Sequence, residues 1–155
     1  MTVRPDLRLE LVSNPAYLCG ARELVHQVAK RCGFAEVQAS QVALATDEAL
    51  INVMRHGYEK REDGRIWLEI TPLSGEGGVG GVMIVIEDEA RQVDPAEIKG
   101  RELEDIKPGG LGVHIIREIM DEVKYERREG VGMRLTMVKR ASDTRAQCPK
   151  GDCCG

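Results

Sequence analysis

The alternation of hydrophobic and polar residues along the chain predicts five strands. Residues 7–12, LRLELV, alternate as a half-buried strand does. Two longer apolar segments follow, at 65–72 (RIWLEITP) and 81–88 (GVMIVIED), and the glycine-rich stretch between them predicts a flexible hairpin connection. Two more alternating segments, 121–127 and 134–140, are joined by REGVG and indicate a second hairpin.

Three segments with helical periodicity lie between these strands. The first is predicted at about 15–31, after the cap and proline of SNP, and its end is marked by the glycine of CGF. The second, at about 35–56, is rich in Ala, Leu, Val and Met and stops at HGY. The third is opened by GGLG and runs to about residue 120. Residues 89–109 show neither period, and we expect them to form a long loop that acts as a lid.

The order of these elements predicts an α+β fold. Strands that arrive in adjacent pairs favour a mixed, mostly antiparallel sheet covered on one face by three helices, a two-layer α/β sandwich, and disfavour a doubly wound sheet. The 155 residues fit one ordinary domain. We place this domain at 1–141 and interpret 142–155 as a flexible tail that contains cysteines.

Charge and hydropathy exclude several classes of partner. The chain has 22 Lys and Arg against 26 Asp and Glu, a formal charge of -4, so no bulk basic field favours direct nucleic-acid or membrane binding. No stretch approaches the roughly 18 apolar residues that span a bilayer, and the first residues lack the hydrophobic region of a signal peptide. We therefore expect a cytoplasmic protein.

The five cysteines agree with a reducing compartment, since an odd number suits free thiols. Cys148, Cys153 and Cys154 cluster in the tail, where a metal site or a redox switch is one interpretation. Three cysteines without paired spacing lack the fourth ligand of a structural zinc site, so we favour an incidental tail.

A polar stripe crosses the second predicted helix. Glu48, Asn52 and His56 recur at four-residue intervals in DEALINVMRHGY, and each interval advances about 40° beyond a full helical turn, so the three side chains share one slanted line. An unpaired buried polar group costs about 1–3 kcal/mol, so the stripe needs a ligand or a hydrogen-bond network. Alternatively, these residues brace neighbouring loops, with His56 beside the negative end of the helix dipole.

Two further features suit a nucleotide site. The segment 81–88 ends in Glu87 and Asp88, and a carboxylate there can accept a hydrogen bond from an exocyclic amine such as that of adenine. The glycines of KPGGLG bring backbone N–H groups to a helix N-terminus, an arrangement that binds anions, although glycines also begin helices for packing reasons.

Three ordered stretches of the chain resemble the motifs of GHKL-type (Bergerat-fold) ATPases. DEALINVMRHGY is similar to their N-box, IEDEARQVDP to their adenine-binding G1 box, and GGLGVHIIREIMDEVKYER followed by GMRLTMVKR to their G2 box and terminal strands. The short length, the HGY after the asparagine and GLGVHIIREIMDEVKY resemble a narrower group, the anti-sigma-factor serine/threonine kinases of bacterial partner-switching systems.

The resemblance implies a role for each matching residue. Asn52 would coordinate Mg²⁺ through its amide oxygen, and Glu48 would be the general base for a protein hydroxyl. Asp88 would bind the adenine amine, and Thr136 would assist it through its hydroxyl or a bridging water. The implied lid hinge, whose N–H groups face phosphate, consists of Gly109, Gly110, Leu111 and Gly112.

The remaining two members of the implied nucleotide-binding set are His56, at the end of the N-box helix, and Ala90 in the G1 box. The G1 box departs from the family pattern DxGxG, because Ala90 and Gln92 of DEARQ replace both glycines. Glycines there permit close backbone approach and unusual torsions, so their replacement predicts weaker ATP binding or a reshaped pocket.

The implied activity is that of an ATP- and Mg²⁺-dependent serine/threonine kinase that acts as an anti-sigma factor. It would hold a sigma factor and phosphorylate a STAS-type anti-anti-sigma protein, and a homodimer is expected from the family. The altered G1 box leaves open a non-catalytic module that regulates a partner by sequestration. A kinase domain detached from a histidine kinase is disfavoured, because no dimerisation helix pair accompanies it.

Overall fold

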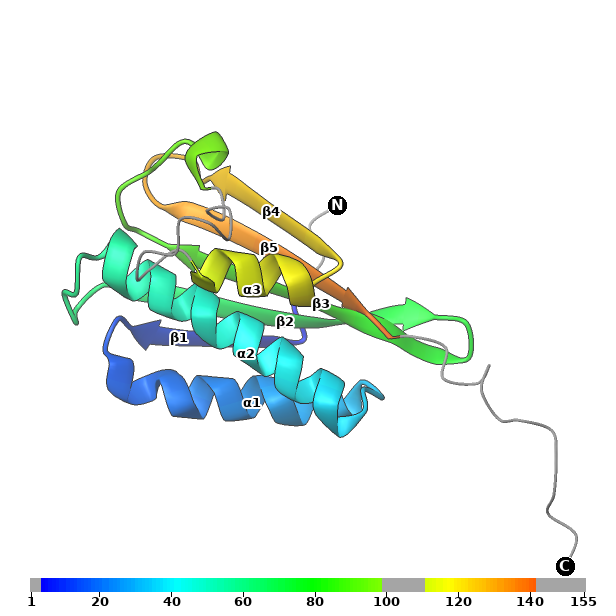
Figure 1. Cartoon of the computed structure of the whole chain (residues 1–155). Coiled ribbons are helices and arrows are strands. Elements are labelled where there is room, and N and C mark those ends of the chain that lie inside the picture. Colours follow the sequence, from blue (N-terminus) through cyan, green and yellow to red (C-terminus); the bar gives the residue numbers. More distant parts are fainter. Residues whose placement is uncertain (1–3, 99–110, 142–155) are drawn as a thin grey trace, which may run out of the picture.

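The computed structural model describes residues 4–98 and 111–141, which form one sheet with helices on one face (Figure 1). The strands are β1 (Leu7–Val12), β2 (Arg65–Gly75), β3 (Gly78–Asp88), β4 (Glu122–Arg127) and β5 (Met133–Arg140). The α-helices are α1 (Leu18–Arg31), α2 (Glu36–Asn52) and α3 (Leu111–Ile119). Short helical turns are η1 (Pro15–Tyr17), η2 (Val53–Gly57) and η3 (Pro95–Glu97).

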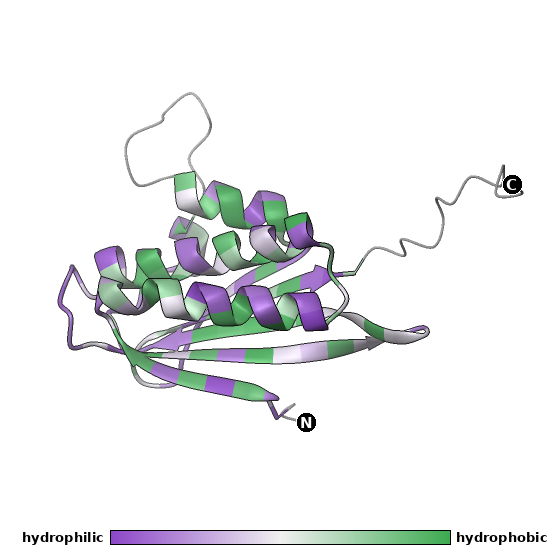
Figure 2. Cartoon of the chain, turned by 90° about the horizontal axis from the view of Figure 1, so that it is seen from below, coloured by the Kyte–Doolittle hydropathy of each residue, from purple (hydrophilic) through white to green (hydrophobic). Residues whose placement is uncertain are grey.

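The sheet has the strand order β1-β2-β3-β5-β4, and each neighbouring pair is antiparallel. The three α-helices lie on one side of it, so the described residues form two layers (Figure 2). The predicted α+β sandwich is confirmed, and the pairing is antiparallel throughout the described strands. Within the described residues, no helix is both long enough and apolar enough to cross a membrane.

The helix ends follow the signals in the sequence. The side chain of Asn14 accepts a hydrogen bond from the N–H of Ala16 at 2.9 Å and caps η1, which leads into α1. Gly33 has a φ of +88° after the end of α1, the left-handed conformation predicted for it. The buried residues of α1, Ala21, Val25 and Ala29, belong to the same core as those of α2.

The second predicted helix ends in a wider turn. α2 continues without interruption into η2, a π-helical turn at Val53–Gly57, so the predicted end near residue 56 is confirmed. Single π-helical turns inside helices occur frequently at functional sites. Here the turn carries His56 beyond the regular helix, above the sheet.

The predicted hairpin between β2 and β3 is present, but its turn is much shorter than the glycine-rich segment 73–80 that the sequence assigned to the connection. Most of the glycine-rich segment is strand, and only Glu76 and Gly77 separate β2 from β3. Gly75 and Gly80 make this possible, because a Cβ at Gly75 would lie 2.5 Å from the Cα of Gly80. Glycine therefore serves close approach of two strands here, rather than flexibility.

The face of the sheet opposite the helices is covered by charged side chains. Trp67 on β2 is only 6% exposed. The guanidinium carbons of Arg8, Arg65 and Arg128 lie 6.0, 4.9 and 5.0 Å from the centre of its ring, within the range of cation–π attraction. Arginine side chains thus shield this indole on the face where the described part of the chain forms no second layer.

Candidate functional site

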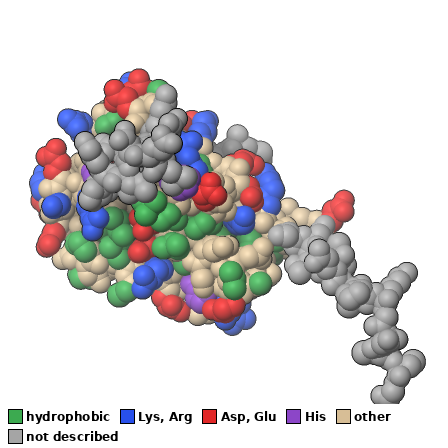
Figure 3. Space-filling model, in the orientation of Figure 1, with side chains coloured by type: hydrophobic (Ala, Val, Ile, Leu, Met, Phe, Trp, Pro, Cys, Tyr) green, Lys and Arg blue, Asp and Glu red, His purple; other side chains and the backbone are tan. Residues whose placement is uncertain are grey.

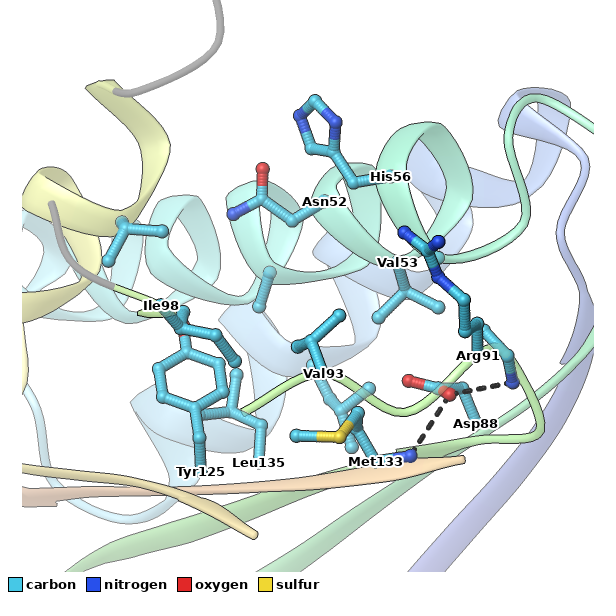
Figure 4. A pocket seen from close by; sticks show the side chains of 15 residues that line it. Asn52, Val53, His56, Asp88, Arg91, Val93, Ile98, Tyr125, Met133 and Leu135 are labelled. Atoms are coloured by element: carbon cyan, nitrogen blue, oxygen red, sulfur yellow. Dashed lines mark hydrogen bonds between the residues drawn. The ribbon is translucent and has the colours of Figure 1, made fainter. Parts of the chain in front are cut away.

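A cavity of about 190 Å³ lies between α2 and its continuation η2 on one side and β3 and β5 on the other (Figure 4). Its walls are mainly apolar, with Val53, Val93, Ile98 and Leu135 among them. The polar side chains that line it come from Asn52, His56, Asp88, Arg91 and Tyr125. An apolar cleft with a few polar groups is typical of a small-molecule site.

Asp88, at the end of β3, is the buried acid of this cavity and is 4% exposed. Its Oδ1 accepts hydrogen bonds from the N–H groups of Ala90 at 2.9 Å and Met133 at 3.1 Å. The other carboxylate oxygen points into the cavity (Figure 4). Burial raises the pKa of Asp88, and the two N–H groups and the Arg128 guanidinium only partly oppose this. The free oxygen is an acceptor fixed at the wall of an apolar cleft.

The loop after Asp88 has ordinary backbone geometry despite its missing glycines. Among the described non-glycine residues, positive φ angles occur at Glu59 and Lys60, and neither Ala90 nor Gln92 has one. Ala90 is buried beside η2, where a Cβ added to Gly57 would lie 3.0 Å from its Cβ. The torsional reason for requiring glycine at these two positions is therefore absent in this chain.

The polar stripe of the sequence meets the start of α3. Asn52 and His56 line the cavity, whereas Glu48 lies one helical turn before Asn52 and outside the lining. A Cβ placed on Gly112 would lie 2.7 Å from Glu48 Oε2 and 3.5 Å from both terminal atoms of the Asn52 amide. Gly112 thus makes room for the carboxylate and the amide at the edge of the cavity.

Thr136 is not brought to the cavity. It lies on β5 opposite Val85 of β3 and Lys124 of β4, and it is not among the residues that line the cleft. Side chains alternate between the faces of a strand, and Leu135 and Met137 face the core, so Thr136 faces the opposite side. Leu111 begins α3 and is 50% exposed, and the predicted Gly109 and Gly110 lie outside the described residues.

Several residues that position Asp88 were missed by the sequence interpretation. The hydroxyl of Tyr58 accepts a hydrogen bond from the N–H of Glu89 at 2.8 Å and donates one to the carbonyl of Arg65. Arg128 donates from its guanidinium to the Asp88 carbonyl at 2.6 Å. The Met133 contact uses a backbone N–H. These partners lie 31 to 45 residues away from the Asp88 loop along the chain, and no local pattern marks them.

The polar groups of the cavity suit a metal ion that is bound together with a nucleotide better than a metal ion that is held by protein side chains alone. Within 4–98 and 111–141, no three His, Cys, Asp or Glu side chains gather as a metal-binding group. Mg²⁺ that accompanies a nucleotide usually takes one or two protein oxygens and completes its shell with phosphates and water. The amide oxygen of Asn52, which lines the cavity, is an oxygen of the required kind.

Comparisons with known proteins agree with this geometry. The family model described as "Histidine kinase-like ATPase domain" matches residues 11–139. "Serine-protein kinase RsbW" of Listeria innocua is 29% identical over 139 residues, which cover 87% of this chain and 88% of that protein. "Anti-sigma F factor" of Priestia megaterium is 29% identical over 115 residues, which cover 72% and 76% of the two chains.

Two solved structures share the fold. A chain in the SiaB–SiaC complex from Pseudomonas aeruginosa has a TM-score of 0.66 at 15% identity and covers 88% of this chain and 90% of its own. The mycobacterial sensor histidine kinase MprB has a TM-score of 0.52 at 12% identity, with coverages of 86% and 97%. At these identities the likeness concerns the arrangement of helices and strands alone.

Proposed function

Because the chain belongs to the histidine kinase-like ATPase domain family, we propose that it is an ATP-dependent serine/threonine protein kinase that acts as an anti-sigma factor. The relatives named serine-protein kinase and anti-sigma F factor support this proposal. The observation that carries it is the buried Asp88 carboxylate, whose free oxygen points into an apolar cleft lined on its other side by Asn52.

ATP suits the cleft on chemical grounds. A purine is flat and apolar on its faces, so it matches walls such as Val53, Val93 and Leu135. The free oxygen of Asp88 can accept a hydrogen bond from the exocyclic amine, a group that distinguishes adenine from guanine at this edge. When bound, ATP supplies the phosphoryl group and Mg²⁺ neutralises its charge.

In this proposal the chain's own residues position the reactants. The amide oxygen of Asn52 would hold Mg²⁺, and His56 lines the same cavity. Glu48, next to Gly112, orients the serine or threonine hydroxyl of a protein substrate and accepts its proton. The backbone N–H groups of Gly109, Gly110, Leu111 and Gly112 are proposed to face the phosphates. Positioning and charge stabilisation are what phosphoryl transfer chiefly requires.

The proposed partners are a sigma factor and a STAS-type anti-anti-sigma protein, with a homodimer as the assembly. Hydrophobic side chains lie among charged ones on the face that carries the helices (Figure 3). Leu44, 41% exposed, is one helical turn before Glu48, and Leu111, 50% exposed, adjoins Gly112. These two leucines flank the proposed base, and we propose that the protein substrate docks against them. Phosphorylation would add up to about -2 charge, which opposes docking on an acidic chain.

The test is incubation of the chain with labelled ATP, Mg²⁺ and candidate STAS proteins. We expect transfer to a serine or threonine as an acid-stable phosphate, and loss of transfer in Glu48→Ala with ATP binding retained. A chain that binds ATP but labels no STAS protein contradicts the kinase proposal. An acid-labile product would instead indicate phosphohistidine.

One alternative is supported by the replaced glycines of DEARQ: a non-catalytic module that regulates a partner by sequestration. Under that alternative, Glu48→Ala would leave regulation of the partner intact. A transcription assay with the wild-type chain and this variant separates the two functions.

A further inference from the structure

Gln92 ties the loop after Asp88 to the turn between β4 and β5. Its side-chain nitrogen Nε2 lies 2.7 Å from the carbonyl oxygen of Arg128 and 3.2 Å from that of Gly132. A glutamine amide carries two N–H donors, so both bonds form at once. Arg128 and Gly132 stand at the two ends of the turn, and the backbone N–H of Arg128 also donates to Gly132 at 3.0 Å. One side chain therefore holds both ends of this turn.

The same turn contacts Asp88 at two points. Its last residue is followed by Met133, whose N–H donates to the Asp88 carboxylate, and its first residue, Arg128, donates from the guanidinium to the Asp88 carbonyl at 2.6 Å. The fit between them is close, because a Cβ on Gly132 would lie 1.8 Å from the Asp88 carbonyl oxygen. The position of this turn consequently sets the direction of the Asp88 carboxylate.

We propose that Gln92 is a positioning residue for adenine recognition. By holding the β4–β5 turn against Asp88, it keeps one carboxylate oxygen engaged with Met133 and aims the other at the exocyclic amine. The inference rests on the proposed function in that it takes ATP as the ligand. A glycine at this position has no side chain to hold the turn, so the departure from DxGxG strengthens recognition in this chain, contrary to what the sequence predicted. Groups fixed before binding lose less freedom when the ligand arrives.

The experiment compares ATP with inosine triphosphate, which has a carbonyl oxygen in place of the amine. Dissociation constants are measured by calorimetry for the wild type, for Gln92→Met, which keeps the shape and loses the donors, and for Gln92→Gly, which restores the family glycine. The value of one to two hydrogen bonds predicts that both variants bind ATP about three- to tenfold more weakly. The dissociation constant for inosine triphosphate should change little in either variant. The ratio between the affinities for ATP and for inosine triphosphate should therefore decrease. Gln41→Met, at an exposed position on α2, is the matched control and should match the wild type.

Several outcomes overturn the inference. One is Gln92→Gly binding ATP as tightly as the wild type, or more tightly. Another is an equal loss of affinity for ATP and for inosine triphosphate, which would indicate a general disruption of the fold and not a change in the orientation of the Asp88 carboxylate. The nucleotide-free protein gives an independent measurement, since the Met133 amide should exchange with solvent faster in both variants, and unchanged exchange also contradicts the proposal. These binding measurements contain no protein substrate, so failure of the kinase proposal appears separately, as absence of transfer by a chain that binds ATP.

Discussion

The hydroxyl oxygen of Tyr58 lies 2.8 Å from the backbone nitrogen of Glu89 and accepts its hydrogen bond. The same hydroxyl donates to the carbonyl of Arg65 at the start of β2. Tyr58 is 3% exposed, and its ring packs on Gly64, where a Cβ would lie 2.5 Å from ring atoms. One phenol therefore joins the end of η2, the start of β2 and the residue next to Asp88.

Replacing Tyr58 by phenylalanine should affect both stability and nucleotide binding. The change leaves the Glu89 N–H and the Arg65 carbonyl without this partner, at a cost of about 1–3 kcal/mol in the free energy of unfolding. ATP affinity should fall as well, because the loop that begins at Asp88 loses one of its anchors. Denaturant unfolding and calorimetry measure the two effects. Tyr17→Phe, at a 55% exposed position, is the matched control, and equal behaviour of the two variants would refute the role of the hydroxyl.

Gly112→Ala should slow phosphoryl transfer without unfolding the chain. The new methyl group would lie 2.7 Å from Glu48 Oε2, the far end of a flexible side chain, so the carboxylate moves and the backbone does not. Misplacement of a catalytic group by about 1 Å can cost on the order of a hundredfold in rate. Single-turnover transfer to the STAS substrate measures the rate, and calorimetry measures ATP binding. Gly20→Ala is the control, since its Cβ would meet no heavy atom within 4 Å; a normal rate in Gly112→Ala would speak against Glu48 as the base.

ATP affinity should decline in mild acid. Burial raises the pKa of Asp88 above the value of about 3.9 that is usual for aspartate, so the carboxylate is protonated at a higher pH than an exposed one. As the pH falls through this raised pKa, the cavity loses its best acceptor for the amine. Folding responds in the opposite sense, because the folded state binds this proton more readily than the unfolded state and is stabilised by it. Asp88→Asn does not titrate and controls for protonation of the nucleotide; an identical pH profile in this variant would exclude Asp88 as the cause.

Asp47→Asn should stabilise the chain at neutral pH. Asp47 on α2 is 9% exposed, its Oδ1 has no hydrogen-bond partner within residues 4–98 and 111–141, and Arg22 approaches Oδ2 only to 3.8 Å. Burial raises the pKa of Asp47, with Arg22 opposing, so the charged form is the costly one. The neutral amide of the variant should raise the free energy of unfolding by about 1 kcal/mol, which corresponds to a rise of roughly 2–4 °C in Tm.

The pH dependence of stability provides the control for Asp47→Asn. Since the folded-state pKa is raised, the unfavourable contribution of the carboxylate is absent below the unfolded-state pKa, grows between the two pKa values and is complete above the folded-state pKa. The advantage of Asp47→Asn should therefore shrink as the pH is lowered toward the ordinary aspartate range. A gain that is independent of pH would assign the effect to packing.

Leu44→Ser should weaken binding of the proposed protein substrate and leave the affinity for ATP unchanged. Leu44 is 41% exposed beside Glu48, and burial of its remaining surface in a complex is worth about 1 kcal/mol, or roughly a fivefold change in KM. Steady-state transfer at varied concentrations of the STAS protein measures this KM. Val37→Ser, at a 69% exposed position near the start of α2, is the control. A KM unchanged by Leu44→Ser would place the docking surface elsewhere.

The sequence predicted the elements well because their signals are local. Apolar alternation marked the strands, and Gly33 marked the end of α1. Helix geometry put Glu48, Asn52 and His56 on one line, and of these Asn52 and His56 line the cavity whereas Glu48 lies outside the lining. The error at 73–80 arose because glycine has two uses, and only the partner strand shows that Gly75 and Gly80 serve close approach.

Local sequence patterns could not predict the hydrogen-bond partners that position the Asp88 carboxylate. Thr136 was chosen for its hydroxyl, yet the buried neighbours Leu135 and Met137 fix it on the other face of the sheet. The groups that do meet Asp88 include the backbone N–H of Met133, which has no residue signature. The cross-links by Gln92 and Arg128 depend on the register of a hairpin about 40 residues away, so only the assembled sheet reveals them.

Trp67 is the single tryptophan of the chain, and its position on the helix-free face has a practical consequence. Arg128 lies 5.0 Å from the centre of the indole ring and also donates to the Asp88 carbonyl. One guanidinium thus touches both the fluorophore and the backbone of the residue that faces the cavity. A ligand that shifts Asp88 changes the surroundings of the indole, so the chain contains its own optical probe for occupancy of the cleft, with no label attached.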